Sequence, residues 1–110
     1  MLKANTVIVK IGEKEYQMSL NFGVLKMLQS EKKDLKIDDI FKGIQNQDYN
    51  LVSQLVCQGI KWNHKDFEMK QLNDLSLVEM LDVFRATEEV VELSLTVTTK
   101  DNEVQSQQGE

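Results

Sequence analysis

A stretch of apolar residues at helical spacing, from Asn50 to Trp62, most constrains how this chain folds. Its main apolar positions recur with the 3.6-residue period of an α-helix; they are Leu51, Val52, Leu55, Val56 and Ile60. Asn50 stands where its side chain can cap the first turn. Cys57 and Gly59 widen the stripe with small residues. We therefore expect a helix over residues 51–62 that contacts more than one neighbour.

Two alternating runs near the N-terminus predict a β-hairpin over residues 6–20. The apolar positions of the two runs are Val7, Val9 and Ile11, then Tyr16, Met18 and Leu20. They are separated by Gly12-Glu13-Lys14, which suits a turn. An isolated hairpin is marginal in water, so its apolar face must pack on the helices that follow.

Apolar spacing predicts further helices, and polar residues mark where they begin. The segments are about 22–30, 38–45, 67–73 and 77–93. We expect Asn21 and Asp66 to cap the first and third of these helices, and a capping box of Ser76 and Glu79 to begin the last. The acidic pair Asp38-Asp39 opens the second, where it favours the positive end of the helix dipole. In the last helix we expect these side chains to face inward: Leu77, Met80, Leu81, Phe84 and Val91.

The C-terminal part changes character after the last predicted helix. Residues 96–99 are threonine and valine, which predicts either an edge strand or an extended exit from the domain. Residues 100–110 hold a single apolar residue, Val104, and we expect a disordered tail there. The predicted fold is mainly α (α+β): one globular domain over residues 1–99, with the hairpin packed on a bundle of four to five short helices.

Composition excludes several classes of function. Thirteen Lys and Arg against eighteen Asp and Glu give a net charge of -5. That charge repels nucleic acid and anionic membranes, so we expect neither as a partner. The one cysteine excludes an internal disulfide and suits a reducing compartment such as the cytoplasm. No apolar run approaches the roughly 18 residues that span a bilayer, and no signal peptide is recognisable.

Reactive side chains form no convincing constellation. Cys57 and His64 are seven residues apart and could pair as nucleophile and base, but Cys57 lies on the apolar helix face, where a thiol is inert. One histidine and one cysteine cannot build a structural zinc site, and the acidic pairs lack the spacing of a calcium loop. The glycines stand too far apart for a phosphate loop. We expect no enzyme, no cofactor and no metal site.

The function must then depend on surfaces that bind a partner. The candidate partner-binding residues are Leu51, Leu55, Trp62 and Phe67. Aromatic residues make up only 6% of the chain, and tryptophan is enriched at interfaces. The same four residues are equally good candidates for the core, because aromatic and leucine side chains supply much of the burial in a small domain.

The layout of the chain resembles the tail assembly chaperones of long-tailed (siphovirus-type) bacteriophages. The resemblance covers roughly residues 6–95 and depends on apolar spacing. Its parts are the hairpin with Gly12 and Tyr16, the stretch from Asn21 to Leu28, the helix from Leu51 to Trp62, the segment Asp66-Phe67-Glu68, and a last helix from Ser76.

The resemblance implies a small, mainly helical protein that coats the tape-measure protein while a phage tail is built. Such a protein recruits the tail-tube subunit, works in the host cell cytoplasm and is absent from the mature virion. Self-association around the client is compatible with this role. Many members are also made in a longer form by translational frameshifting near the C-terminus, and residues 100–110 would then mark where the short form ends.

Two other functions remain open from the sequence. A permanent part of the phage particle, such as a head-tail connector or completion protein, shares the small size and mixed architecture. A small regulatory adaptor that binds one protein would equally lack reactive residues. Detection of the polypeptide in purified virions favours the first, and a one-to-one complex without a tape-measure protein favours the second.

Overall fold

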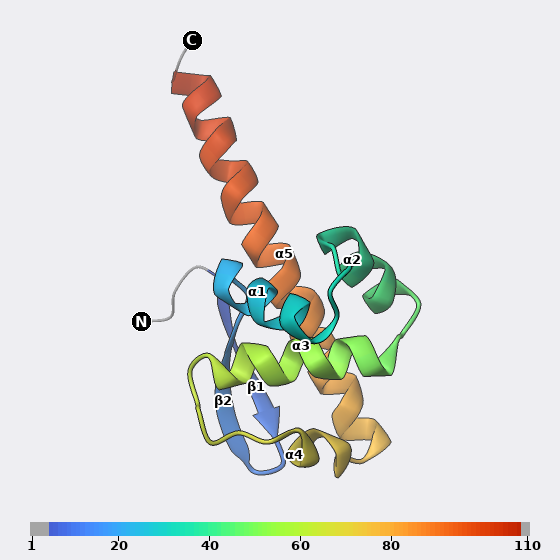
Figure 1. Ribbon diagram of the computed structural model, residues 1–110. Coiled ribbons are helices and arrows are strands. Elements are labelled where there is room, and N and C mark those ends of the chain that lie inside the picture. Colours follow the sequence, from blue (N-terminus) through green and yellow to red (C-terminus); the bar gives the residue numbers. More distant parts are fainter. Residues whose placement is uncertain (1–4, 109–110) are drawn as a thin grey trace.

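A two-stranded antiparallel hairpin and five helices make up the part of the chain that the structure describes. The computed structural model describes the backbone of residues 5–108 and the side chains of residues 5–94. Figure 1 shows the elements in chain order. They are β1 (Thr6–Ile11), β2 (Lys14–Ser19), α1 (Phe22–Glu31), α2 (Ile37–Gln45), α3 (Tyr49–Lys61), α4 (Met69–Asn73) and α5 (Leu77–Gln108). The predicted fold class, a hairpin packed on short helices, is confirmed.

The hairpin forms from the two predicted runs, but its turn is one residue shorter than the predicted Gly12-Glu13-Lys14. Val7 pairs with Met18 and Val9 with Tyr16, so the apolar positions of both strands share one face. The turn has only two residues, because β2 already begins at Lys14. Gly12 lies at φ +66°, a left-handed conformation that glycine adopts without the steric cost of a Cβ.

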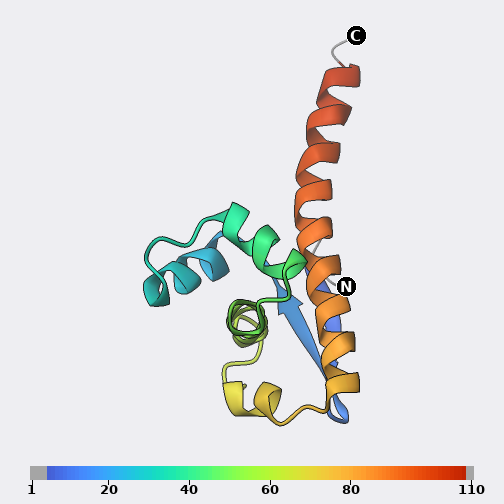
Figure 2. The same ribbon diagram turned by 90° about the vertical axis from the view of Figure 1, so that its right-hand side faces the viewer.

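Helix α3 lies at the centre of the domain, as the wide apolar stripe predicts. In Figure 2 it is seen nearly end-on, with α1 and α2 above it, α4 below it, and the hairpin and α5 to one side. Its buried residues reach from Leu51 to Ile60 and include Cys57 and Gly59. The helix begins at Tyr49 and its cap is Asp48, whose Oδ1 accepts from the Leu51 amide at 3.2 Å. The prediction of Asn50 as cap is therefore wrong.

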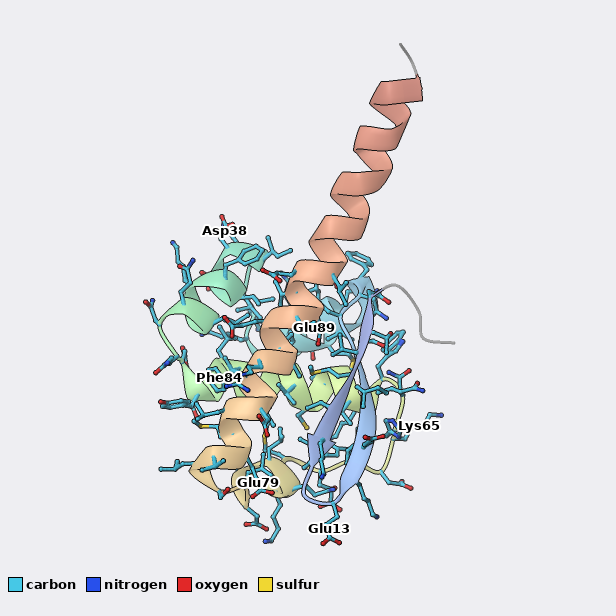
Figure 3. All side chains as sticks on the ribbon, turned by 180° about the vertical axis from the view of Figure 1, so that it is seen from behind. Glu13, Asp38, Lys65, Glu79, Phe84 and Glu89 are labelled. Atoms are coloured by element: carbon cyan, nitrogen blue, oxygen red, sulfur yellow. The ribbon has the colours of Figure 1, made fainter. Side chains whose placement is uncertain are left out.

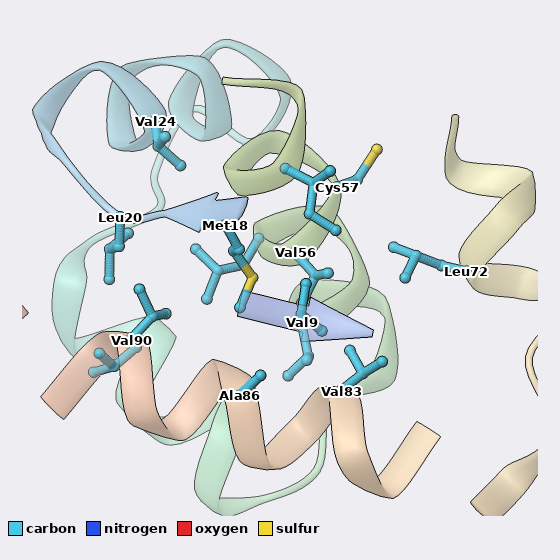
Figure 4. Packing of buried hydrophobic residues seen from close by; sticks show 14 of the residues in the cluster. Val9, Met18, Leu20, Val24, Val56, Cys57, Leu72, Val83, Ala86 and Val90 are labelled. Carbon is cyan, nitrogen blue, oxygen red and sulfur yellow. The ribbon is translucent and has the colours of Figure 1, made fainter. Parts of the chain in front are cut away.

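The core joins one face of the hairpin to α3 and α5. In Figure 4, Val9 and Met18 of the hairpin meet Val56 of α3 and Val83 and Ala86 of α5. Small and β-branched side chains dominate this junction, so the three elements approach closely.

The segment between α3 and α4 fastens the outer edge of β2. The Asn63 side-chain amide donates to the Gln17 carbonyl at 3.0 Å and to Ser19 Oγ at 2.9 Å. The Gln17 amide donates to His64 Nε2 at 2.9 Å. These bonds occupy main-chain groups that an edge strand otherwise leaves open.

Of the other predicted N-caps, two are confirmed and one is wrong. Asn21 caps α1, and its Oδ1 accepts from the Val24 amide at 2.8 Å, as predicted. The capping box at α5 is also confirmed, with Ser76 and Glu79 exchanging hydrogen bonds at 3.0 and 3.2 Å. The short helix α4 begins later than expected and its cap is Glu68, so the prediction of Asp66 as cap is wrong.

At α2 the N-cap is Lys36, one residue before the helix begins at Ile37. The acidic pair lies inside the first turn, as the helix dipole favours, and Asp39 Oδ2 accepts from the Lys36 amide at 2.8 Å. The predicted segment 38–45 is therefore correct to within one residue at its start.

Helix α5 differs most from expectation. It is one helix from Leu77 to Gln108 and projects beyond the rest of the domain (Figures 1 and 2). Residues 96–99 are helical, so neither an edge strand nor an extended exit forms there. The backbone is helical through residue 108 as well, while residues 109–110 of the predicted disordered tail lie outside the described residues.

The buried face of α5 also differs from the predicted one. Val83, Ala86, Thr87, Val90 and Val91 are buried. Of the residues expected to face inward, only Val91 is buried; Met80 and Phe84 are partly exposed, and Leu77 and Leu81 are exposed. The helix is apolar around most of its first turns, so its own periodicity permits two inward faces. The hairpin packs against the face with the smaller side chains, and the leucines remain outside.

Candidate surface for partner binding

The unburied face of α5 carries the densest group of exposed apolar side chains among the described residues. Leu77 is 78% exposed, Val78 73% and Leu81 53%. Scattered apolar residues at a protein surface are normal, but adjacent exposed leucines and valines on one helix mark interaction sites. This group adjoins a groove, which gives it shape as well as hydrophobicity.

The groove lies between the first turns of α5, the start of α3 and the link from α4. We call it the α5 groove, and its volume is about 260 Å³. Its lining residues are Tyr49, Asn50, Val52, Ser53, Leu72, Asn73, Leu75, Leu77, Met80, Val83 and Phe84. A second hollow continues it along α5 toward the end of α2, where Ile44, Gln45 and Gln47 face Leu81, Arg85 and Glu88.

Aromatic packing holds one wall of the groove in place. The rings of Tyr49 and Phe84 meet edge to face, with centroids 5.6 Å apart and planes at 69°. This arrangement is favoured by the ring quadrupoles. Figure 3 shows Phe84 on the side of α5 away from the hairpin. The wall is thus tied to α3 and does not depend on a partner for its position.

The charges around the α5 groove are mainly negative. Between residues 68 and 92 the only cations are Lys70 and Arg85. Lys70 Nζ pairs with Asp74 at 2.7 Å, and an Arg85 nitrogen lies 3.7 Å from Asp82. Both pairs lie at the surface, where ion pairs contribute little to stability. The exposed carboxylates one to three turns further along α5 are Glu88, Glu89 and Glu92.

A smaller groove between α1 and α2 has the opposite charge. Its volume is about 250 Å³ and its lining residues are Phe22, Leu25, Lys26, Gln29, Leu35, Lys36, Ile37 and Ile40. Phe22 is 76% exposed, and the Lys26 ammonium lies 5.8 Å from the centre of its ring. This is a cation–π distance, so Phe22 already has an intramolecular partner.

Three of the four predicted partner-binding residues lie in the core. Leu51, Leu55 and Phe67 are buried, so in this conformation they offer no surface to a partner. Trp62 is 47% exposed, and its indole lies over Gly23 of α1, where a Cβ would overlap the ring. The structure brings Leu51 and Leu55 together on α3 and places Trp62 at the other end of that helix.

The residues that line the α5 groove were not predicted as a site. The available signal was the excess of apolar residues in the first turns of α5, where Leu77, Val78, Met80 and Leu81 exceed what one buried stripe uses. Such an excess indicates that a second surface exists. Only the packing shows which side chains compose it.

The cysteine and the histidine hold structural positions. Cys57 is buried, and burial raises the pKa of its thiol, with Lys61 opposing and Glu31 adding to this effect. A raised pKa suppresses the thiolate and so the nucleophile. His64 Nε2 accepts the Gln17 amide, and its ring meets Tyr16 edge to face at 5.1 Å. The hydrogen bonds of the described residues include none between Cys57 and His64.

The described residues also lack the features of a metal site and of a membrane-spanning helix. No group of three or more histidine, cysteine, aspartate or glutamate side chains there is placed to hold a metal ion. In the same part of the chain, no helix combines the length and the apolar character needed to cross a membrane.

Comparison of the chain with models of protein families, with curated proteins and with solved structures finds no match.

Proposed function

We propose that this protein is a tail assembly chaperone of a long-tailed bacteriophage. In this role it binds the tape-measure protein, keeps it soluble and helps to recruit tail-tube subunits while the tail is built. It acts in the cytoplasm of the host cell and is absent from the mature virion. No bond is made or broken, and the work is done by surfaces.

The observation that carries the proposal is the α5 groove. A tape-measure protein is long and helical, and it aggregates when its apolar faces are left uncovered. A protein that shields it must itself expose apolar surface and still remain soluble. The groove, with Leu77, Val78 and Leu81 beside it, offers that surface on a chain whose net charge is -5.

The size of the exposed group suits reversible binding. Full burial of a leucine or valine side chain is worth roughly 1.5–3 kcal/mol. Three such side chains, partly offset by the cost of association, support a weak contact with one client segment. Many copies bound along a long client gain strength by multivalency, and each still releases when tube subunits displace it.

The sequence layout supports the same role. The hairpin, the helix capped by Asn21, the central helix α3 and the final helix with its Ser76 cap follow one another as in the family that the chain resembles. The acidic-aromatic segment Asp66-Phe67-Glu68 lies between α3 and α4, where Phe67 is buried.

The test is co-expression with the tape-measure protein of the phage that encodes this chain. We expect the client to move from the insoluble to the soluble fraction and to co-purify with the chaperone. The double variant Leu77→Ser with Leu81→Ser removes the apolar surface and should abolish both effects. Because both side chains are largely exposed, the variant should keep its fold, which circular dichroism checks.

A matched control is Met27→Ser on α1. Met27 is 49% exposed, close to the value for Leu81, and does not line the α5 groove. It should leave client solubility unchanged. A client that stays insoluble with the unmodified chaperone across several client lengths contradicts the proposal, as does detection of the protein in purified virions.

A further inference from the structure

The shape of the α5 groove selects a helix as its occupant. Met80 and Phe84 are four residues apart on α5, and so are Leu77 and Leu81, so the two pairs form adjacent rows on one side of the helix. Rows at this spacing are the ridges between which the side chains of a second helix pack. The groove is bounded by helices and by the α4–α5 link, and no strand edge lines it.

The charged side chains around the groove determine which charge a bound helix should carry. The hollow that continues the groove has Arg85 and Glu88 on its α5 side and the uncharged Ile44, Gln45 and Gln47 on its α2 side. Glu92 follows one turn after Glu88. The nearest cation on α5, Arg85, is already within 3.7 Å of Asp82. A helix laid along this face therefore meets carboxylates that have no cationic partner among the described residues.

We propose that the α5 groove binds an amphipathic helix that presents lysine or arginine to Glu88 and Glu92 and packs its apolar face on Leu77, Leu81 and Phe84. The source of this helix, a segment of the tape-measure protein, rests on the proposed function. The chemistry of the site does not. A second copy of this chain is disfavoured as occupant because its charge has the same sign as the rim.

The probe is a synthetic amphipathic peptide of about 20 residues, long enough to follow some 30 Å of helix. It carries leucine at positions i, i+3, i+4 and i+7, and lysine on the flanks of that stripe. A twin peptide has glutamate in place of lysine. Fluorescence anisotropy with the full chain should show about tenfold tighter binding of the lysine peptide, with the difference shrinking as salt is raised.

Two charge-reversal variants locate the effect. Glu88→Lys with Glu92→Lys should remove the preference for the lysine peptide or invert it. Glu13→Lys with Glu15→Lys makes the same change in net charge on the exposed turn and β2 of the hairpin, and it should leave most of the preference in place. Leu77→Ser with Leu81→Ser should weaken both peptides.

Several results overturn the inference. Equal binding of the two peptides does so, and so does an equal effect of the two charge-reversal variants, because the attraction then depends on net charge alone. A concentration-dependent dimer that Leu77→Ser with Leu81→Ser dissociates would assign the groove to a second copy.

The failure of this inference is separable from the failure of the proposed function. If client solubility requires Leu77 and Leu81 but is indifferent to Glu88→Lys with Glu92→Lys, only the charge rule is wrong. If the lysine peptide binds as described but no tape-measure protein is solubilised, the site stands and the chaperone role falls.

Discussion

Gly59 offers the sharpest test of how the central helix meets the hairpin. A Cβ built at Gly59 would lie 2.7 Å from the Ser19 carbonyl oxygen and 2.9 Å from Met18 Cγ. The first of these is a main-chain atom, so the clash cannot be relieved by turning a side chain. Gly59→Ala therefore forces α3 and β2 apart by roughly 0.6 Å, to reach an ordinary carbon–oxygen contact of about 3.3 Å.

The local hydrogen bonds oppose that movement. Ser19 Oγ is bonded to Thr6 Oγ1 at 2.7 Å and to the Asn63 amide at 2.9 Å, so β2 is held from both sides. Overpacking of a well-packed core costs about 1–3 kcal/mol, and the rigid neighbour places this site in the upper half of the range. The higher helix propensity of alanine compared with glycine stabilises the fold by about 1 kcal/mol. The net expectation is a loss of about 1–2 kcal/mol.

Urea unfolding followed by circular dichroism and by Trp62 fluorescence measures this loss. In thermal unfolding each kcal/mol of this loss lowers Tm by about 4–8 °C for a domain of this size. The matched control is Gly43→Ala, where the three atoms nearest to the new Cβ all belong to the Leu51 side chain, which can change rotamer. There the gain in helix propensity should offset the crowding, with little net change. If Gly59→Ala is as stable as the parent, or more so, the close approach inferred here is wrong.

Three further predictions concern single side chains. His64→Ala should lower stability by about 1–2 kcal/mol and speed hydrogen exchange at the Gln17 amide, because that amide loses its acceptor and Tyr16 loses a ring contact; unchanged exchange would refute this. Cys57 should resist iodoacetamide in the folded chain near pH 8.5 and react in urea, because burial raises the pKa of its thiol. The contribution of the protonated thiol to the free energy of unfolding is complete below about pH 8.5 and is lost as the pH rises through the folded pKa. Hydrogen bonding to Ser76 lowers the pKa of Glu79, so the contribution of this carboxylate to the stability of the fold is complete above about pH 4.3 and is lost as the pH falls through the folded pKa. Glu79→Gln should therefore make stability depend less on pH in this window. An identical acid unfolding profile for both proteins would contradict the assignment.

Much of the fold could be predicted because it depends on local patterns. The hairpin follows from alternation and from Gly12, whose left-handed conformation few other residues adopt. The caps at Asn21 and Ser76 follow from short-range hydrogen bonding that each segment makes by itself. Segments with one clear apolar stripe were placed to within a few residues.

The errors fall where two local solutions compete. Both Asp48 and Asn50 can cap a helix, and the packing of α3 decides between them. Glu68 displaces Asp66 as the cap of α4, and Phe67, just before it, enters the core and meets the Tyr16 ring at 5.0 Å. Neither choice can be read from spacing, because each depends on what the neighbouring element covers.

The candidate surface also shows which features depend on local pattern and which depend on tertiary packing. The sequence by itself determined the hairpin and the central helix, since each is a matter of pattern and residue type. Only the tertiary structure decided which side of α5 is buried. That helix is apolar on two sides, and the side with valine and alanine packs against β1, where small side chains permit a close approach. Leu77 and Leu81 are left facing outward as a consequence, and they form the surface on which the proposed function depends.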